Sequence, residues 1–171
     1  MNTWITSDLH LFHKNIITYC NRPHSDEYEM NDVIINAWNS TVKPDDRVIV
    51  VGDLTAGLYD RQDALLEVIG RLAGVKTLVM GNHDHLRPRW YKEAGFANVV
   101  KHSYEDGVLF VHKPAGELHP KSIALKERYK PKIIIHGHVH ALGPEFDGHF
   151  NVAWDRHNRL LSLEEIISKC N

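Results

Sequence analysis

One pattern recurs along the chain: a short apolar run ends in residues that can bind a metal ion or move a proton. In the clearest case, an apolar run at 78–80 leads directly into Gly81-Asn82-His83-Asp84. In an α/β protein, this is how the carboxyl end of a buried strand opens into an active-site loop. The recurrence constrains the fold, because it requires several strands to end at one edge of a sheet.

The first half of the chain alternates between strand and helix patterns. Apolar, β-prone runs at 3–6, 47–51 and 76–80 predict strands, and the run at 47–51 is continuous enough to be buried on both faces. Apolar residues at helical spacing predict helices at 26–39 and 60–73. This order favours parallel strands joined by crossover helices.

The second half predicts a different arrangement. Segments 99–103 and 108–112 are expected to form a hairpin across the turn at 105–107. Further elements are expected as strands at 133–135 and 150–154, a surface loop at 113–130, and a last helix with a capping box formed by Ser162 and Glu165. We therefore expect a single domain over residues 1–171 with two sheets and helices outside them.

Composition excludes several classes of partner. A net charge of −2 provides no global field to attract DNA, RNA or anionic lipid, so a nucleic-acid contact would have to be local. Cys20 and Cys170 form no metal-binding or disulfide pattern. With no apolar run long enough for a membrane span and no leader-like start, we expect a cytoplasmic protein without a membrane partner. The sequence predicts no oligomeric state.

The chain has 13 scattered histidines, which makes metal binding the first explanation to test. Each potential ligand alone is a weak signal, and His112 alone would more often be a satisfied strand-end histidine. Together, however, the candidates follow β-runs at their carboxyl ends: Asp8, His10, Asp53, Asn82, His83, Asp84, His112, His138 and His140. Such a set can hold two divalent ions with one shared carboxylate, and without a thiolate it favours Mn, Fe, Co, Ni or Zn.

These motifs resemble those of the calcineurin-like metallophosphoesterases. The resemblance rests on Asp-x-His at 8–10, Gly-Asp at 52–53, Gly-Asn-His-Asp at 81–84, the strand-end His112 and Gly-His-x-His at 137–140, in that order. Residues 151–155 are similar to the closing strand of small single-domain bacterial and phage members. The resemblance implies an α/β fold, a two-sheet β-sandwich flanked by helices (α-β-β-α), with a dinuclear metal site at the strand carboxyl ends.

The resemblance also implies a role for each ligand. One metal ion would be held by Asp8, His10, Asp53 and His140, and the other by Asp53, Asn82, His112 and His138. His83 would protonate or stabilise the leaving oxygen, and Asp84 would orient its ring. The glycines Gly52, Gly81 and Gly137 would let the backbone turn sharply beside the ions. Manganese is the favoured metal, with Ni, Fe, Co or Zn as alternatives.

The resulting hypothesis is a metal-dependent phosphodiesterase. Two adjacent cations lower the pKa of a bridging water, and the resulting hydroxide attacks a small, nucleotide-type phosphodiester. Gly-Asn-His-Asp in place of Gly-Asn-His-Glu, small size and no cap domain favour diesters. A phosphatase or a nuclease with the same site remains an alternative, as does a non-catalytic interaction protein on this fold. An HD-type hydrolase is set aside, because its motif sits on helices.

Several residues near the motifs have more than one interpretation. Arg22 could contact a substrate phosphate, although a surface salt bridge is the commoner role. His85 and His136 border the motifs and could support ligands or serve the structure. The remaining histidines, among them His13 and His119, are expected to be solvated for the most part.

Overall fold

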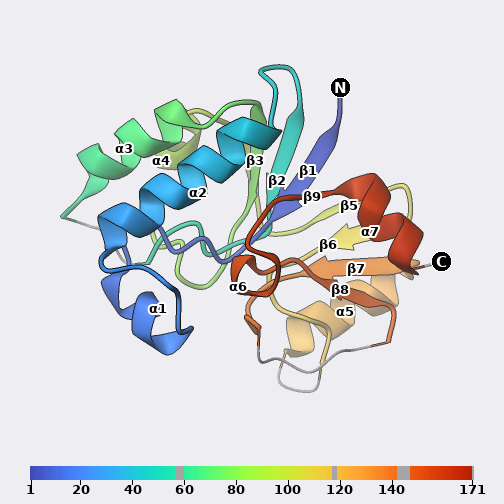
Figure 1. The fold of residues 1–171 in the computed structure, drawn as a ribbon. Coiled ribbons are helices and arrows are strands. Elements are labelled where there is room, and N and C mark those ends of the chain that lie inside the picture. Colours follow the sequence, from blue (N-terminus) through green and yellow to red (C-terminus); the bar gives the residue numbers. More distant parts are fainter. Residues whose placement is uncertain (57–59, 117–118, 142–146, 171) are drawn as a thin grey trace.

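The computed structural model describes residues 1–56, 60–116, 119–141 and 147–170, and two sheets stack in its centre (Figure 1). The first sheet has the order β4-β3-β2-β1-β9. Its strands are β1 (Thr3–Thr6), β2 (Arg47–Val50), β3 (Val75–Val79), β4 (Phe96–Val100) and β9 (Leu161–Ser162). Strands β1 to β4 pair in parallel, and β9 pairs antiparallel to β1. The expected parallel, crossover-linked first half is confirmed.

The second sheet has the order β5-β6-β7-β8. Its strands are β5 (Ser103–Glu105), β6 (Val108–Phe110), β7 (Ile133–His136) and β8 (His149–Asn151). Strands β5 and β6 form the expected antiparallel hairpin, whereas β6, β7 and β8 pair in parallel. Strands β1, β2, β3, β6 and β7 can therefore all deliver loops to one region.

Helices cover the outer faces of both sheets (Figure 1). The first sheet is covered by α2 (Glu27–Thr41), α3 (Gln62–Arg71) and α4 (Pro88–Glu93), with α1 (Lys14–Tyr19) beyond its carboxyl edge. The second sheet is covered by α5 (Pro120–Tyr129), while α6 (Trp154–His157) and α7 (Leu163–Cys170) follow the last strands. These layers confirm the expected α-β-β-α architecture.

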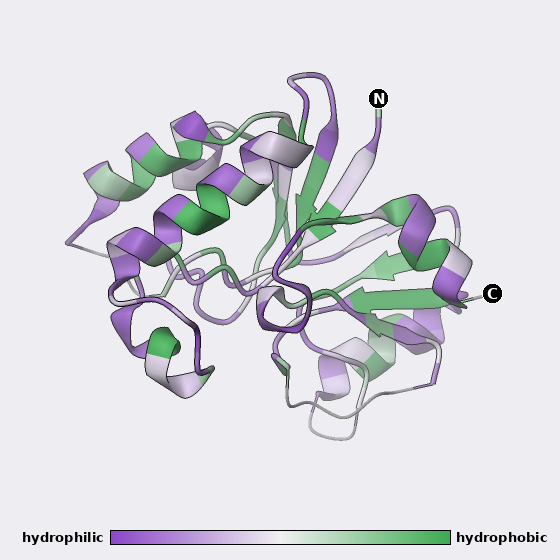
Figure 2. Ribbon diagram, viewed as in Figure 1, coloured by the Kyte–Doolittle hydropathy of each residue, from purple (hydrophilic) through white to green (hydrophobic). Residues whose placement is uncertain are grey.

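The alternation of side chains along β2 shows why the layers form. Val48 and Val50 pack into the cluster under the helices, with Trp38 and Leu65. Ile49 faces the opposite way, into the cluster between the sheets. Figure 2 shows the corresponding green strands between helices that are purple on their outer surfaces. A strand buried on both faces explains the continuous apolar run in the sequence.

The first turns of the helices differ in how they are capped. The Asp26 carboxylate accepts hydrogen bonds from the backbone N–H groups of Tyr28 and Glu29, so it caps α2. The Ser162 hydroxyl accepts one from the Glu165 N–H at 3.0 Å, which confirms half of the expected capping box. Helix α3, in contrast, starts after Arg61 without a side-chain cap.

Three expectations for the second half are wrong. The strand predicted at 150–154 ends early, because β8 stops at Asn151 and α6 begins at Trp154. The predicted strand at 99–103 is split: β4 ends the first sheet at Val100, and β5 begins the second at Ser103. The predicted loop at 113–130 contains α5, which follows Pro120. Leu125 and Tyr129 of this helix pack against the outer face of the second sheet, a stabilisation that local sequence pattern does not reveal.

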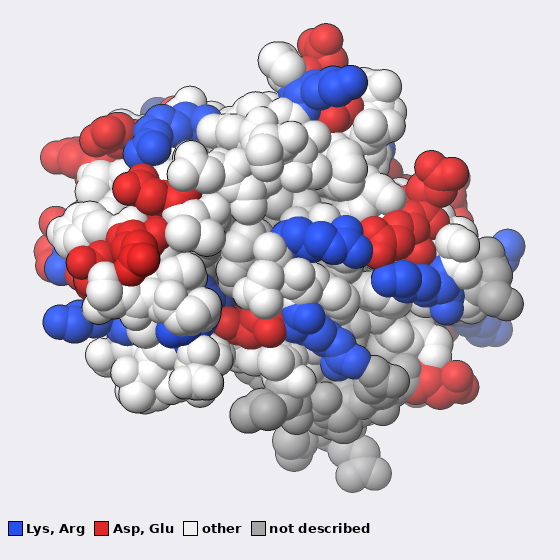
Figure 3. Space-filling view, in the orientation of Figure 1, with Lys and Arg blue, Asp and Glu red and all other residues white. Residues whose placement is uncertain are grey.

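The surface carries charges of both signs. On the face drawn in Figure 3, lysine and arginine side chains alternate with acidic ones rather than forming a band of one sign. Among the described residues, no helix combines the length and the apolar character that crossing a membrane requires.

Candidate metal centre

The predicted ligands meet at the carboxyl edge of the two sheets. They lie just after β1 (Asp8 and His10), β2 (Asp53), β3 (Asn82, His83 and Asp84), β6 (His112) and β7 (His138 and His140). Parallel strands place their carboxyl ends at the same edge, and the two stacked sheets bring two such edges together. Segments far apart in sequence therefore build one site.

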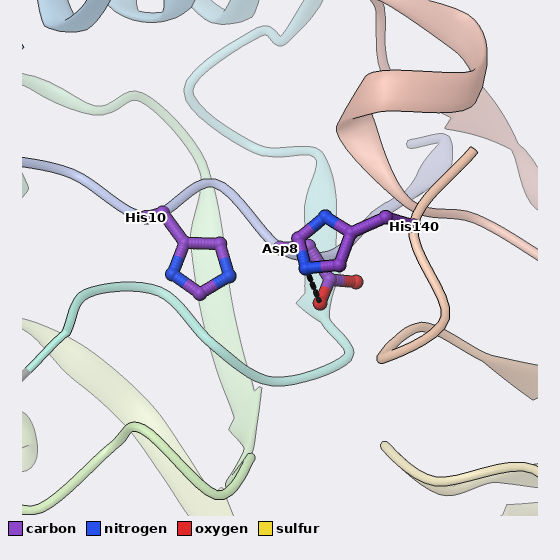
Figure 4. Close-up of side chains that lie close together, drawn as sticks. All are labelled: Asp8, His10 and His140. Atoms are coloured by element: carbon purple, nitrogen blue, oxygen red, sulfur yellow. Dashed lines mark ion pairs between the residues drawn. The ribbon is translucent and has the colours of Figure 1, made fainter. Parts of the chain in front are cut away.

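The first ligand group consists of Asp8, His10 and His140, drawn in Figure 4. Their ligand atoms all lie within 4.8 Å of one another. The Nε2 atom of His140 is 3.8 Å from Oδ1 of Asp8, and the rings of His10 and His140 stack at 5.2 Å. Both ring nitrogens of His10 are buried without a hydrogen-bond partner among the described residues. Such an orphaned ring is what a metal ion would satisfy.

The second group consists of Asp53, His112 and His138, again with all ligand atoms within 4.8 Å. Nδ1 of His112 donates to the Val51 carbonyl at 2.8 Å, which leaves Nε2 facing Oδ2 of Asp53 at 3.2 Å. The same Oδ2 lies 3.8 Å from Nε2 of His10. Asp53 thus stands between the groups, where a shared ligand must be.

Asn82 and His83 occupy the border of these groups. Asn82 lines a groove together with His112, next to the second group. The ring of His83 contacts His10 edge to face at 5.4 Å, next to the first group. His83 is thus placed beside the ligands, as its expected role requires.

The Asp84 carboxylate bonds to backbone N–H groups rather than to the His83 ring, so the predicted orienting role is corrected. Its Oδ2 accepts hydrogen bonds from the backbone N–H groups of Asp53 and Gly81, at 2.9 and 2.8 Å. Its Oδ1 accepts one from the N–H of Leu54 at 3.0 Å. Asp84 is buried, and its hydrogen bonds connect the loop after β3 to the loop that carries Asp53.

The ligand loops contain an unusual amount of left-handed backbone. Asp8, His10, Asp53, His138 and His140 have φ values of 56°, 51°, 51°, 71° and 48°. This conformation costs about 1–3 kcal/mol of folding free energy per residue, and it persists only where the surrounding structure holds it in place. Strain of this kind is characteristic of functional sites, and no sequence pattern announced it.

Of the three glycines expected at sharp turns, only Gly52 has a positive φ, at 88°. Gly81 and Gly137 are required for a different reason: a Cβ at Gly81 would overlap the Asp53 carboxylate, and one at Gly137 would overlap that of Asp8. Close approach of backbone to ligand, rather than turn conformation, explains these two positions.

The electrostatics suit a cation. Burial lowers the pKa of His10 to about 2, outweighing the attraction of Asp53, so His10 presents the neutral imidazole that metals bind. Burial alone would raise the pKa of Asp53, but the hydrogen bond to His112 and its charge hold that pKa below the usual range. For His112, burial is outweighed by the two aspartates, and the pKa rises to about 9. A proton on His112 therefore balances aspartate charge at a position where a metal ion would otherwise do so.

Each group offers one carboxylate and two histidines that are neutral or can lose a proton. With Asp53 shared, such a set fits two divalent transition metal ions. The predicted ligands Asp8, His10, Asp53, His112, His138 and His140 are brought together as expected, and Asn82 borders them.

A buried ion pair supports His140, and the sequence analysis missed it. Oδ2 of Asp155 accepts a hydrogen bond from Nδ1 of His140 at 2.6 Å, which directs Nε2 toward Asp8. Nε of Arg22 donates to Oδ1 of Asp155 at 2.6 Å. Arg22 also donates to the backbone carbonyls of Asp8 and Leu9, at 2.7 and 2.8 Å. The expectation that Arg22 forms a surface salt bridge is wrong, because its side chain is 3% exposed.

Cys20, His140 and Asp155 also lie close enough together to suggest a third metal group. The Cys20 sulfur is 3.4 Å from Nδ1 of His140. That nitrogen, however, carries the proton donated to Asp155, and burial raises the pKa of the Cys20 thiol to about 11. The cluster therefore orients His140 and does not supply metal donors.

Histidines outside the predicted set also approach the centre. The ring of His13 lies 5.4 Å from that of His10, and the ring of His119 lies 5.0 Å from that of His138. His136 is 1% exposed, with Nδ1 2.9 Å from the Gly137 carbonyl, and burial lowers its pKa to about 4. His85 contacts the ring of His83 at 6.2 Å. His13 and His119 are partly exposed, and tertiary packing rather than local sequence brings their rings to the site.

Two hollows border the centre. A cavity of about 520 Å³ adjoins the first group and is lined by His10, His13, Ile16, Tyr19, His83 and Val139, among others. A groove of about 370 Å³ adjoins the second group and is lined by Asn82, His112, Lys101, Lys113 and Lys121, among others. A substrate held at the metals would have room on both sides.

Comparison with known proteins agrees with this geometry. A family model described as the calcineurin-like phosphoesterase superfamily domain matches residues 1–161. The chain is 33% identical over 138 residues to the uncharacterised protein MJ1445 of Methanocaldococcus jannaschii, covering 81% of this chain and 69% of that protein. It is 32% identical to the gene 66 protein of Mycobacterium phage L5, covering 99% of this chain and 94% of that protein.

Two solved structures share the fold. The protein AQ665 of Aquifex aeolicus, a protein of unknown function, superposes with a TM-score of 0.76 at 24% identity, over 98% of each chain. The phosphopantetheinyl hydrolase PptH of Mycobacterium tuberculosis superposes with a TM-score of 0.51 at 14% identity, over 95% of each chain. At such identities the likeness is one of fold.

Proposed function

The chain belongs to the calcineurin-like phosphoesterase superfamily, and on this premise we propose that it hydrolyses small phosphodiesters with two divalent transition metal ions. The observation that carries the proposal is the pair of ligand groups, Asp8, His10, His140 and Asp53, His112, His138, with Asp53 between them. When bound, such ions lower the pKa of water and neutralise phosphate oxygens. Manganese is the ion we favour.

The residues of the chain divide the remaining work. Asp8, Asp53 and the histidines would hold both ions, and Asp155 and Val51 fix the rings of His140 and His112 for that purpose. As water adds to phosphorus, the bond from phosphorus to the leaving oxygen breaks, and that oxygen needs a proton. His83, beside the first group, supplies it.

The preference for a diester rests on the surroundings of the site. A phosphodiester carries an organic group on each side of the phosphorus, whereas a monoester carries one. The cavity beside His10 and the groove beside His112 offer space for two such groups. The Gly-Asn-His-Asp sequence at 81–84 supports the same choice through the family resemblance.

The test is a comparison of two chromogenic substrates. Protein purified without chelator is assayed with bis-p-nitrophenyl phosphate and p-nitrophenyl phosphate in the presence of Mn, Ni, Zn or Mg. We expect faster hydrolysis of the diester, and fastest with Mn. No hydrolysis with any metal would overturn the enzymatic function and favour a non-catalytic interaction protein. Faster hydrolysis of the monoester would identify a phosphatase instead.

A further inference from the structure

Three lysines converge on the groove beside Asn82 and His112. Lys101 follows β4, Lys113 directly follows His112, and Lys121 lies in the first turn of α5. Three separate segments thus contribute a lysine each to the lining of one hollow of about 370 Å³ that borders the second ligand group.

Among the described residues, no acidic side chain pairs with the lysines of this groove. Of the described residues that line the groove, none is an aspartate or glutamate. The chain as a whole carries a net charge of −2, so this accumulation is local rather than a consequence of composition. An uncompensated basic hollow attracts an anion.

The cavity on the other side of the metal centre differs in character. Next to the first ligand group, Ile16, Tyr19 and Val139 contribute apolar surface and His13 a half-buried ring. A substrate lying across the centre would therefore meet apolar surroundings at one end and cations at the other.

We propose that the substrate carries a second phosphate group, bound in the groove of Lys101, Lys113 and Lys121. Its uncharged organic part then occupies the cavity of Ile16, Tyr19 and Val139. The chemical class is a nucleotide-like phosphodiester with an additional phosphate. This inference rests on the proposed phosphodiesterase function. It adds which end of the substrate is charged and which end is uncharged at the same site.

The same phosphate chemistry occurs in a single-stranded polynucleotide, where the next phosphate along the strand would take the groove. The structure favours a small molecule. The groove gathers three lysines in one place, and the net charge of −2 provides no wider positive field to hold a long polyanion.

Adenosine 5′-monophosphate and bisphosphates serve as probes. Binding of adenosine 5′-monophosphate and of the 2′,5′- and 3′,5′-bisphosphates to the Mn-loaded protein is measured by calorimetry, and inhibition of bis-p-nitrophenyl phosphate hydrolysis is measured in parallel. We expect at least one bisphosphate to bind about tenfold more tightly, the scale of one or two phosphate contacts. In the double variant Lys101→Ala/Lys113→Ala, this advantage should fall below about twofold.

The matched control is Lys126→Ala, which removes an exposed lysine from the same helix as Lys121 but outside the groove. It should retain the full advantage. Equal affinity for all three probes in the parent protein would overturn the proposal, as would an equal loss for the monophosphate and the bisphosphates in the double variant. Tighter binding of a tetranucleotide than of any bisphosphate would replace it with a nucleic-acid substrate. Calorimetry reports these outcomes even if hydrolysis is absent, so failure here differs from failure of the proposed function.

Discussion

Replacing Asp155 with asparagine tests how the fold holds one metal ligand. The Asp155 side chain is 2% exposed and binds Nδ1 of His140 and Nε of Arg22, each at 2.6 Å. Asparagine keeps the shape but removes the negative charge, leaving the buried Arg22 guanidinium unpaired. Breaking a buried pair in this way costs about 3–5 kcal/mol. Mutation of the residue that orients a ligating histidine lowers metal affinity by about 10–100-fold.

The two effects are separable by measurement. Urea denaturation reports the free energy of unfolding, and calorimetric titration with Mn resolves the two binding steps. We expect the step that involves His140 to weaken by about 10–100-fold, while the step at His112 and His138 changes little. The control Asp32→Asn removes an exposed carboxylate, 64% exposed, and should affect neither measurement. Loss of stability with unchanged Mn affinity at both steps would refute the orienting role of Asp155.

Three further predictions concern single residues. His83→Ala should retain its bound Mn by elemental analysis yet hydrolyse the diester about a hundredfold or more slowly, and an equal loss of metal and turnover would contradict its role as proton donor. Gly81→Ala should lose Mn, because the added Cβ overlaps the Asp53 carboxylate; a variant with the full Mn content would show that the loop adjusts. Asp46 accepts hydrogen bonds from the Asn2 N–H at 2.7 Å and the Trp4 indole at 3.0 Å, which lower its pKa from 3.8 to about 2. Since this folded-state pKa is depressed, its stabilisation is present above the unfolded value and lost as the pH falls through the interval from 3.8 to about 2. The difference in urea midpoint between the parent and Asp46→Asn should therefore be constant at neutral pH and shrink in acid, whereas a pH-independent difference would exclude the linkage.

The ligand set could be predicted because each member follows a strand. Asp8, Asp53 and His112 come from different strands, yet the rule that parallel strands share a carboxyl edge was enough to place them together. Their conformation was not predictable, since the left-handed backbone at Asp8 and Asp53 depends on the loops around them. The pairing of the two sheets was likewise hidden: residues 99–103 were expected to form one strand, although the chain changes sheets within them.

Contacts over long sequence separations account for most of the rest. Arg22 and Asp155 are 133 residues apart, and neither local pattern indicates that the other exists. A buried arginine is uncommon, so the prior for Arg22 favoured the surface. Helix α5 was missed because Pro114, Gly116 and Pro120 are residues typical of loops, whereas its stability comes from packing on the second sheet.

The most direct test of the account is the metal stoichiometry of the active protein. Apoprotein is titrated with Mn while bound metal and diester hydrolysis are measured together. The account predicts that turnover reaches its maximum at about two ions per chain. It also predicts that Asp53→Asn, which removes the carboxylate lying between the two groups, loses both high-affinity ions and the turnover with them. Full turnover with a single bound ion, or in Asp53→Asn, would contradict a dinuclear centre built around Asp53.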